Sequence, residues 1–248
     1  MLKRMLTSAI VAGGVAGLFA ALLHFAFLQD KILLAEHYEV GALVHFAGAA
    51  PPTHGHDPAA AAVPDSVAPV AAGADVAAAG TGLKRDALTV ALSALIHVAY
   101  ALILIAGFAV AALYGRRVTA REGALWGIAG FAAFQLAPAM GLAPELPGTL
   151  AADLAARQVW WWGTVAATAG GLALIAFFGR GAAAILGIVL LAAPHVIGAP
   201  VPDGFFGTAP PELAAGFAAS VLGVGLAVWS VLGALAGRLW SGSDPTAP

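Results

Sequence analysis

The chain contains no cysteine and very few charged residues for its length. Without cysteine it cannot form disulfides, thiolate metal sites, iron–sulfur clusters or a cysteine nucleophile. Only 10% of its 248 residues are charged, too few to cover a water-soluble domain of this size. It also lacks the phosphate-binding loop of ATP motors, the common hydrolase signatures and a basic nucleic-acid-binding patch. We therefore predict a protein that is not an enzyme and does not bind nucleic acid.

Hydrophobic residues make up 61% of the sequence, which indicates lipid as the main solvent of the protein surface. A bilayer core of about 30 Å is crossed by roughly 20 apolar helical residues. Runs of that length occupy residues 6–28, 87–114, 123–142, 159–178 and 213–237. A sixth run, 182–197, is shorter and ends at Pro194 and His195. The sequence predicts an all-α, polytopic membrane helix bundle with about six transmembrane helices, or five if the short run does not span.

The distribution of charge predicts the orientation of the chain. If the N-terminus is cytoplasmic and six spans alternate, seven of the eleven basic residues lie inside. These residues are Lys3, Arg4, Arg116, Arg117, Arg121, Arg180 and Arg238. Eleven of the thirteen acidic residues then lie outside. Because Lys and Arg accumulate on the cytoplasmic side, we predict a bacterial inner-membrane protein with a cytoplasmic N-terminus and a periplasmic first loop.

The segments follow from this topology. Residues 1–28 form the first transmembrane helix, which is too long for a typical signal peptide. Residues 29–86 form the periplasmic loop, and its Ala/Pro-rich part, 49–82, predicts a flexible tether. Residues 87–238 form the transmembrane bundle and residues 239–248 a cytoplasmic tail.

Three Gly-x-x-x-Gly pairs lie within the spans, at 13/17, 123/127 and 233/237. This spacing allows helices to approach closely in lipid. In a chain with 31 glycines chance matches are common, so we interpret the pairs as ordinary packing within one bundle.

All seven histidines fall in the outer half of this topology, together with most of the acids. Imidazole and carboxylate suit borderline divalent ions such as cobalt, nickel, zinc and copper. The candidate capture ligands in the first loop are Glu36, His37, Glu39, His45, His54 and His56. An accidental polar patch in a linker explains this cluster equally well.

Three further histidines, His24, His97 and His195, lie in the outer parts of three different spans. Polar groups within a span are costly and often mark a transport pathway or a ligand site. At one depth the three can build an open metal site, with Glu145 or Asp153 reaching in from a later loop. A lone histidine can also do no more than hydrogen-bond a neighbouring helix, and paired histidines in spans can be axial ligands of haem.

The most distinctive string is Pro-Glu-Leu-Pro-Gly at 144–148, followed by Arg157, Gln158 and the triplet Trp160–Trp162. A glutamate between two prolines has a restricted backbone, which suits a residue held at the mouth of a pore. The three tryptophans predict an interfacial aromatic belt. Arg157 can reach the headgroups or pair with Asp153 one helical turn earlier.

These motifs, with the segment Ala35–Glu39 and the glycine-rich first span, resemble the CbtA family of proposed bacterial cobalt-transporter subunits. The resemblance covers nearly the whole chain, although the Ala/Pro-rich tether and the sixth span fit it poorly. It implies cobalt uptake linked to cobalamin synthesis, and a small one-span partner, CbtB, that carries histidines.

The sequence therefore predicts a membrane subunit that captures a divalent ion on the outer face and passes it inward. Cobalt is the first choice of ion, and nickel or zinc are alternatives. Two other functions stay open, a structural or assembly subunit of a larger membrane complex and a haem-binding electron-transfer subunit. Expected partners are membrane lipid and the one-span subunit, with a homo-oligomer as a further option.

Overall fold

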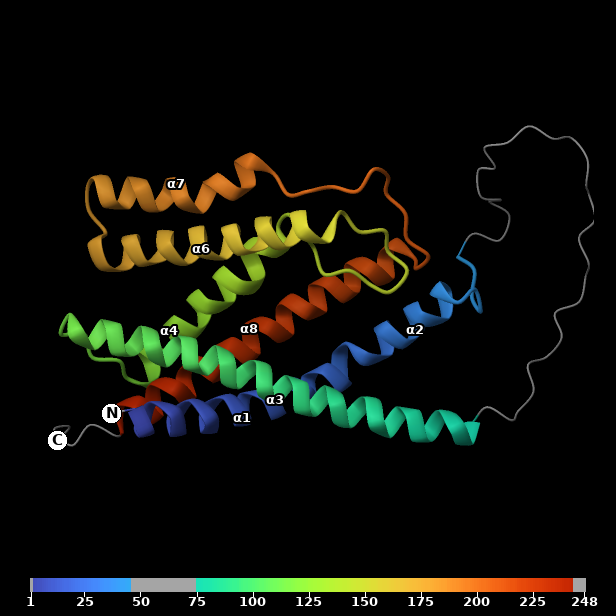
Figure 1. Cartoon of the computed structure of the whole chain (residues 1–248), viewed down its shortest axis with the longest axis horizontal. Helices are drawn as coiled ribbons and strands as arrows, with labels where there is room; N and C mark the ends of the chain where they lie inside the picture. Colours follow the sequence, from blue (N-terminus) through green and yellow to red (C-terminus); the bar gives the residue numbers. More distant parts are fainter. Residues whose placement is uncertain (1, 46–74, 243–248) are drawn as a thin grey trace, which may run out of the picture.

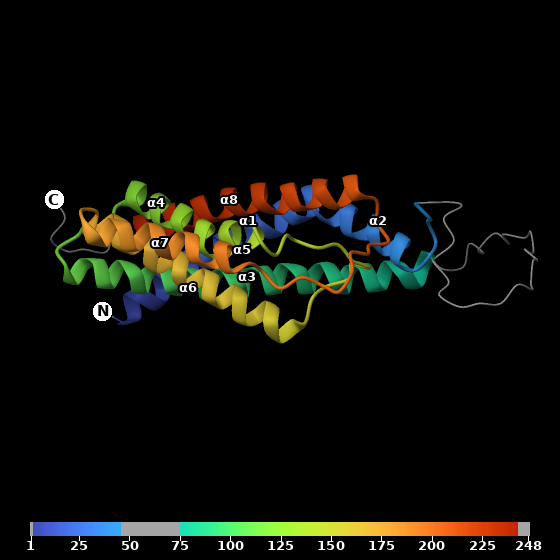
Figure 2. The ribbon, with the colours of Figure 1, turned by 90° about the horizontal axis from the view of Figure 1, so that it is seen from above.

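The computed structural model describes residues 2–45 and 75–242. Within these ranges the regular secondary structure is helical apart from one isolated β-bridge, Thr149 with Gly207. The helices are α1 (Leu2–Phe27), α2 (Gln29–Glu39), α3 (Asp75–Leu113), α4 (Ala120–Phe131), the π-helical turn η1 (Ala132–Leu136), α5 (Ala137–Ala139), α6 (Leu154–Phe178), α7 (Ala182–Ile197) and α8 (Pro211–Ser241). They form an elongated bundle (Figures 1 and 2), with α6 and α8 on opposite sides when it is seen from above.

Four helices in the described part of the chain are long and apolar enough to cross a membrane, namely Met5–Phe27, Gly82–Leu113, Leu154–Phe178 and Pro211–Ser241. The apolar helix α7 is shorter, and it lies antiparallel to α6 (Figure 1). The segment α4–η1–α5 is continuous from residue 120 to 139, which corresponds to about 30 Å of helix, but the π-helical turn interrupts it. In its described residues the structure shows an all-helical bundle with four candidate membrane spans, and the count of six spans stays a prediction.

Both described ends of the chain lie at the same end of the bundle (Figure 1). The α3–α4 connection and the α6–α7 turn lie there too, so this end carries Lys3, Arg116, Arg117, Arg121, Arg180 and Arg238. We call it the basic end. The opposite end is formed by α2, the start of α3 and the loops 140–153 and 198–210. It carries Asp30, Glu36, Glu39, Asp86, Glu145, Asp153, Asp203 and Glu212, and we call it the acidic end.

Two predicted segment boundaries shift. Helix α3 already begins at Asp75, so residues 75–82 of the predicted tether are helical. The rest of the tether, residues 49–74, belongs to the segment 46–74 that lies outside the described residues. Helix α8 runs to Ser241 and includes the first three residues of the predicted tail.

Helix α4 begins at the basic end in a capping box. The side-chain oxygen of Thr119 accepts a hydrogen bond from the Glu122 N–H at 3.4 Å, and the Thr119 N–H donates to the Glu122 carboxylate at 2.8 Å. The bond from the Thr119 backbone is the main reason that the pKa of Glu122 lies below its usual value. This cap allows the helix to start directly after the short link from α3.

Glycines set the closest helix crossing on α1. A side-chain carbon added to Gly13 would collide with the backbone of Val98 on α3, and one added to Gly17 would lie 2.8 Å from the Ser93 carbonyl oxygen. Helices α1 and α3 therefore run antiparallel with their backbones almost in contact.

Glycines also allow close backbone contact between α4 and α8. Gly123 and Gly127 on α4 face Gly237 and Gly233 on α8, and a side chain on any of the four would collide with the opposite backbone. All three Gly-x-x-x-Gly pairs are used inside one chain, so the interpretation as packing within the bundle is confirmed.

A separate small core holds the acidic end together. Leu28 and Ala35 pack with Leu146 and with Phe217 of α8. The two loops are also joined, because the Leu150 N–H donates to the Phe206 carbonyl oxygen at 2.9 Å. Leu146 is only 4% exposed, so the central leucine of the Pro-Glu-Leu-Pro-Gly string anchors its loop.

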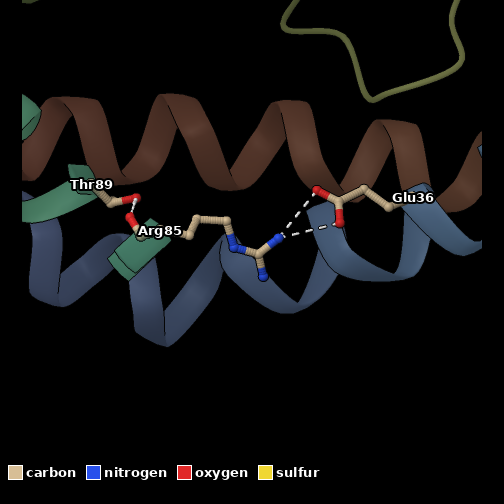
Figure 3. Close-up of polar contacts among 3 residues, drawn as sticks. All are labelled: Glu36, Arg85 and Thr89. Carbon is tan, nitrogen blue, oxygen red and sulfur yellow. Dashed lines mark hydrogen bonds and ion pairs between the residues drawn. The ribbon is translucent and has the colours of Figure 1, made fainter. Parts of the chain in front are cut away.

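An ion pair ties α2 to α3 at this end. Figure 3 shows Arg85 of α3 directed toward the Glu36 carboxylate on α2, with the shorter contact at 3.3 Å. The Thr89 hydroxyl donates to the carbonyl oxygen of Arg85 at 3.0 Å. Both charged side chains are more than 40% exposed, so the pair contributes no more than about 1 kcal/mol to stability.

Candidate functional site

A pocket of about 410 Å³ opens at the acidic end between η1, the loop after α5, α6 and α8. We call it the acidic-end pocket. Its lining includes the side chains of Phe134, Gln135, Glu145, Arg157, Trp161 and Leu222. Six water molecules occupy roughly 180 Å³ in the liquid, so the pocket has room for a divalent cation with its first hydration shell.

Glu145 and Arg157 form an ion pair on the wall of this pocket. The guanidinium donates to the carboxylate at 2.9 Å, and the side chains are 32% and 27% exposed, respectively. Buried Leu146 fixes the loop beside Glu145. The Asp153 carboxylate accepts the Ala156 N–H at 2.9 Å and so begins α6 one turn before Arg157.

Two contacts are predicted for Arg157, with the headgroups or with Asp153 at helical spacing. The structure does not form the second, because the Asp153 side chain caps α6. Arg157 turns instead to Glu145, twelve residues earlier. Asp153 is exposed, and among the described residues it has no contact with a histidine.

Gln135 lies in the π-helical turn, where the Ala137 N–H bonds to the Ala132 carbonyl oxygen five residues earlier. Single π-turns are rare in proteins, and those that occur often lie at functional sites. The Gln135 side-chain oxygen is buried and has no hydrogen-bond partner, which costs about 1–3 kcal/mol.

Aromatic rings form part of the pocket wall. Phe134 packs on Trp161 of α6 with ring centroids 6.0 Å apart, and it stacks on Trp229 of α8 at 5.7 Å. Tyr100 of α3 lies 4.6 Å from Trp229. Four elements, η1, α3, α6 and α8, therefore contribute to a set of contacting rings that starts at the pocket wall, and we call it the aromatic layer.

The three tryptophans at 160–162 lie in different environments. Trp162 is 61% exposed, as expected of a residue in an interfacial belt. Trp161 faces the pocket, and Trp160 donates its indole N–H to the Pro194 carbonyl oxygen at 3.2 Å. Two of the three tryptophans thus pack inside the bundle.

The structure does not bring His24 and His97 to one level. The contacts of Gly13 with Val98 and of Gly17 with the neighbourhood of Ala94 fix the register of α1 against α3. This register places His24 near residue 87 of α3, and His24 lies within electrostatic range of Asp86. His97 is ten residues further along, about 15 Å. Ligands of one ion lie within about 2.1 Å of it, so these two imidazoles cannot share one.

Two of the in-span histidines, His97 and His195, contact neighbouring backbone or aromatic groups. The Nδ1 atom of His97 lies 2.7 Å from the Ser93 carbonyl oxygen, and its ring packs edge-on against Tyr100. The ring of His195 packs edge-on against Trp160. Their assignment as metal ligands stays a prediction.

None of the first-loop candidates within the described residues lines the acidic-end pocket. His37 and Glu39 are in the last turn of α2, and Glu36 pairs with Arg85. His45 is exposed at the edge of the described range, and His54 and His56 lie outside it. Within residues 2–45 and 75–242, no group of three or more His, Asp or Glu side chains lies close enough to hold a metal ion.

Two polar residues of interest were not found from the sequence. Gln135 is the polar amide in an otherwise apolar run, which is a signal that could have identified it. Asp86 was placed at the end of a loop, yet its side-chain oxygen Oδ1 is buried without a hydrogen-bond partner and lies near His24.

Comparison with known proteins gives one result. The family model described as "Probable cobalt transporter subunit (CbtA)" matches residues 2–241. No curated protein and no solved structure matches the chain.

Proposed function

Since this chain belongs to the CbtA family of probable cobalt transporter subunits, we propose that it is the membrane subunit of a divalent-cation uptake system with cobalt as its cargo. The acidic end faces the periplasm and the basic end faces the cytoplasm of a bacterial inner membrane. The acidic-end pocket receives the ion, and Glu145 supplies the negative charge that holds it. A small one-span partner subunit completes the system.

The observation that carries this proposal is the Glu145 carboxylate, held at a pocket large enough for a hydrated ion. Its partner Arg157 carries one positive charge, whereas a divalent ion at the same distance doubles the Coulomb attraction. Arriving cations therefore compete with Arg157 for the carboxylate. When no cation is bound, the Arg157 guanidinium pairs with the Glu145 carboxylate, so the pocket does not hold an unpaired negative charge.

The aromatic layer supports a pocket that is open to one side. Phe134 and Trp161 line the pocket, and Phe134 also stacks on Trp229 of α8, so we expect an ion that moves inward from the pocket to meet these rings. Passage of the ion requires these rings to separate, and such a movement fits a subunit that depends on a partner or a gradient.

The histidines enter the proposal at two places. His54 and His56, with the neighbouring Asp57, are capture ligands that raise the local ion concentration near the acidic end. His97 packs against Tyr100, whose ring contacts Trp229 of the aromatic layer, so it is the candidate for a contact after the rings have opened.

The direct test is cobalt accumulation by cells that lack other cobalt uptake and produce this chain with its partner subunit. We expect accumulation at submicromolar external cobalt well above that of cells with an empty vector, with nickel and zinc tested as competitors. Accumulation equal to the empty vector, with the protein present in the membrane, contradicts the proposal. A protein that instead copurifies with a large complex and carries no metal fits the assembly function.

A further inference from the structure

Two polar side chains that line the acidic-end pocket, Gln135 and Gln158, take no part in the ion pair. Of the two, Gln135 is the one with a buried oxygen that lacks a hydrogen-bond partner, whereas the nearby Glu145 carboxylate accepts from Arg157. A buried carbonyl oxygen without a donor is costly. An amide kept in this state beside a pocket indicates a partner that is bound only part of the time.

The backbone around Gln135 is also irregular. The π-helical turn widens the helix at residues 132–136, and Pro138 follows directly in α5. Proline has no N–H and cannot continue a regular ladder back to residue 134. The irregularity is thus encoded in the sequence next to the amide, on the wall of the pocket.

Helix α8 leaves room for this side chain. A side-chain carbon added to Gly225 would collide with the Gln135 oxygen and would lie 2.9 Å from its amide carbon. The pocket residues of α8 in this region, Val221 and Leu222, are apolar and offer no side-chain donor. The glycine therefore makes a niche for the amide that contains no side-chain partner for the oxygen.

We infer that Gln135 binds the cation in the acidic-end pocket through its side-chain oxygen, together with Glu145. This inference rests on the proposed function and adds the second ligand. Amide and carboxylate oxygens with water are a common shell for divalent cations, and a cation or its bound water supplies the partner that the oxygen lacks. The last torsion of a glutamine is broad and roughly two-fold, so the amide can exchange the positions of its oxygen and nitrogen without movement of the helix.

The test is isothermal titration of cobalt chloride into the full-length protein, purified in detergent. Gln135→Leu keeps the size of the side chain but removes the oxygen, and it should weaken cobalt binding at least 10-fold. Gly225→Ala adds no polar group but displaces the amide, so we expect a similar loss. Gly223→Ala, on the same helix with nothing within 4 Å of the added carbon, should bind within twofold of wild type. Gln135→Glu, which keeps an oxygen, should bind at least as tightly as wild type.

Thermal melting without cobalt provides the second readout. Gln135→Leu should melt at or above the temperature of wild type, because it removes a buried oxygen without a partner. If it melts much lower, Gly225→Ala and its control decide the result. Wild-type affinity in Gln135→Leu or in Gly225→Ala overturns the inference and leaves the proposed function standing. Absence of cobalt binding to wild-type protein overturns both.

Discussion

The Gly13→Ala variant should be markedly less stable than wild type, whereas Gly14→Ala should be as stable or slightly more stable. A methyl group on Gly13 would collide with the Val98 backbone of α3, and backbone cannot move aside as a flexible side chain can. Overpacking of this kind costs about 1–3 kcal/mol, or several degrees in melting temperature for a chain of this size. The measurement is the thermal melting of both variants in the same detergent.

Gly14 is the matched control because it is the next residue on α1 and has nothing within 4 Å of an added carbon. Replacing an unconstrained helical glycine with alanine favours the helix by up to about 1 kcal/mol. The two variants should therefore shift the melting temperature in opposite directions. Equal shifts would mean that α1 and α3 do not cross at Gly13.

The Glu145→Gln variant should lose most cobalt uptake at low external cobalt. It keeps the size of the side chain and a hydrogen-bond acceptor for Arg157, but it removes the one negative charge that the described residues contribute to the pocket lining. A charged contact is worth about 1.5–3 kcal/mol, and each 1.4 kcal/mol is tenfold. We expect uptake to fall about 10- to 100-fold when cobalt is limiting.

Glu212→Gln is the control for this experiment. Glu212 is an exposed carboxylate in the first turn of α8, at the same end of the bundle but outside the pocket lining. Its variant should transport within twofold of wild type, and both variants should reach the membrane in similar amounts. Equal losses in the two variants would indicate that general negative charge at this end, and not the pocket, attracts the ion.

Helical class and charge asymmetry could be predicted from the sequence because both depend on residues that are close in the chain. Apolar runs define lipid-embedded helices whatever their neighbours are. The glycine pairs were harder to interpret, because the same spacing arises by chance. Only the structure shows that Gly123 and Gly127 meet Gly233 and Gly237.

The two prolines around Glu145 indicate a restricted backbone from the sequence, but the ion pair of Glu145 with Arg157 could not be predicted. Helical spacing offered Asp153 as one of two contacts for Arg157. The N-terminus of α6 needs an acceptor for its free N–H groups, and Asp153 meets that need. Arg157 then pairs with a residue on a loop whose path is set by the burial of Leu146, and this burial involves α2 and α8.

The depth of the histidines was estimated from the ends of the apolar runs, which is too coarse for a shared site. Close contact at Gly13 and Gly17 sets the register between α1 and α3, and this register separates His24 from His97. The unpartnered oxygen of Gln135 depends on a π-helical turn and on a glycine of α8, 90 residues away. Such long-range combinations have no signature in a single sequence.

The central claim is that a divalent cation binds in the acidic-end pocket at Glu145. The most direct measurement is anomalous diffraction at the cobalt absorption edge from crystals of the protein grown with cobalt. We predict an anomalous peak about 2.1 Å from a Glu145 carboxylate oxygen, and no such peak in crystals of Glu145→Gln. Cobalt bound elsewhere in the chain with an empty acidic-end pocket would contradict the claim.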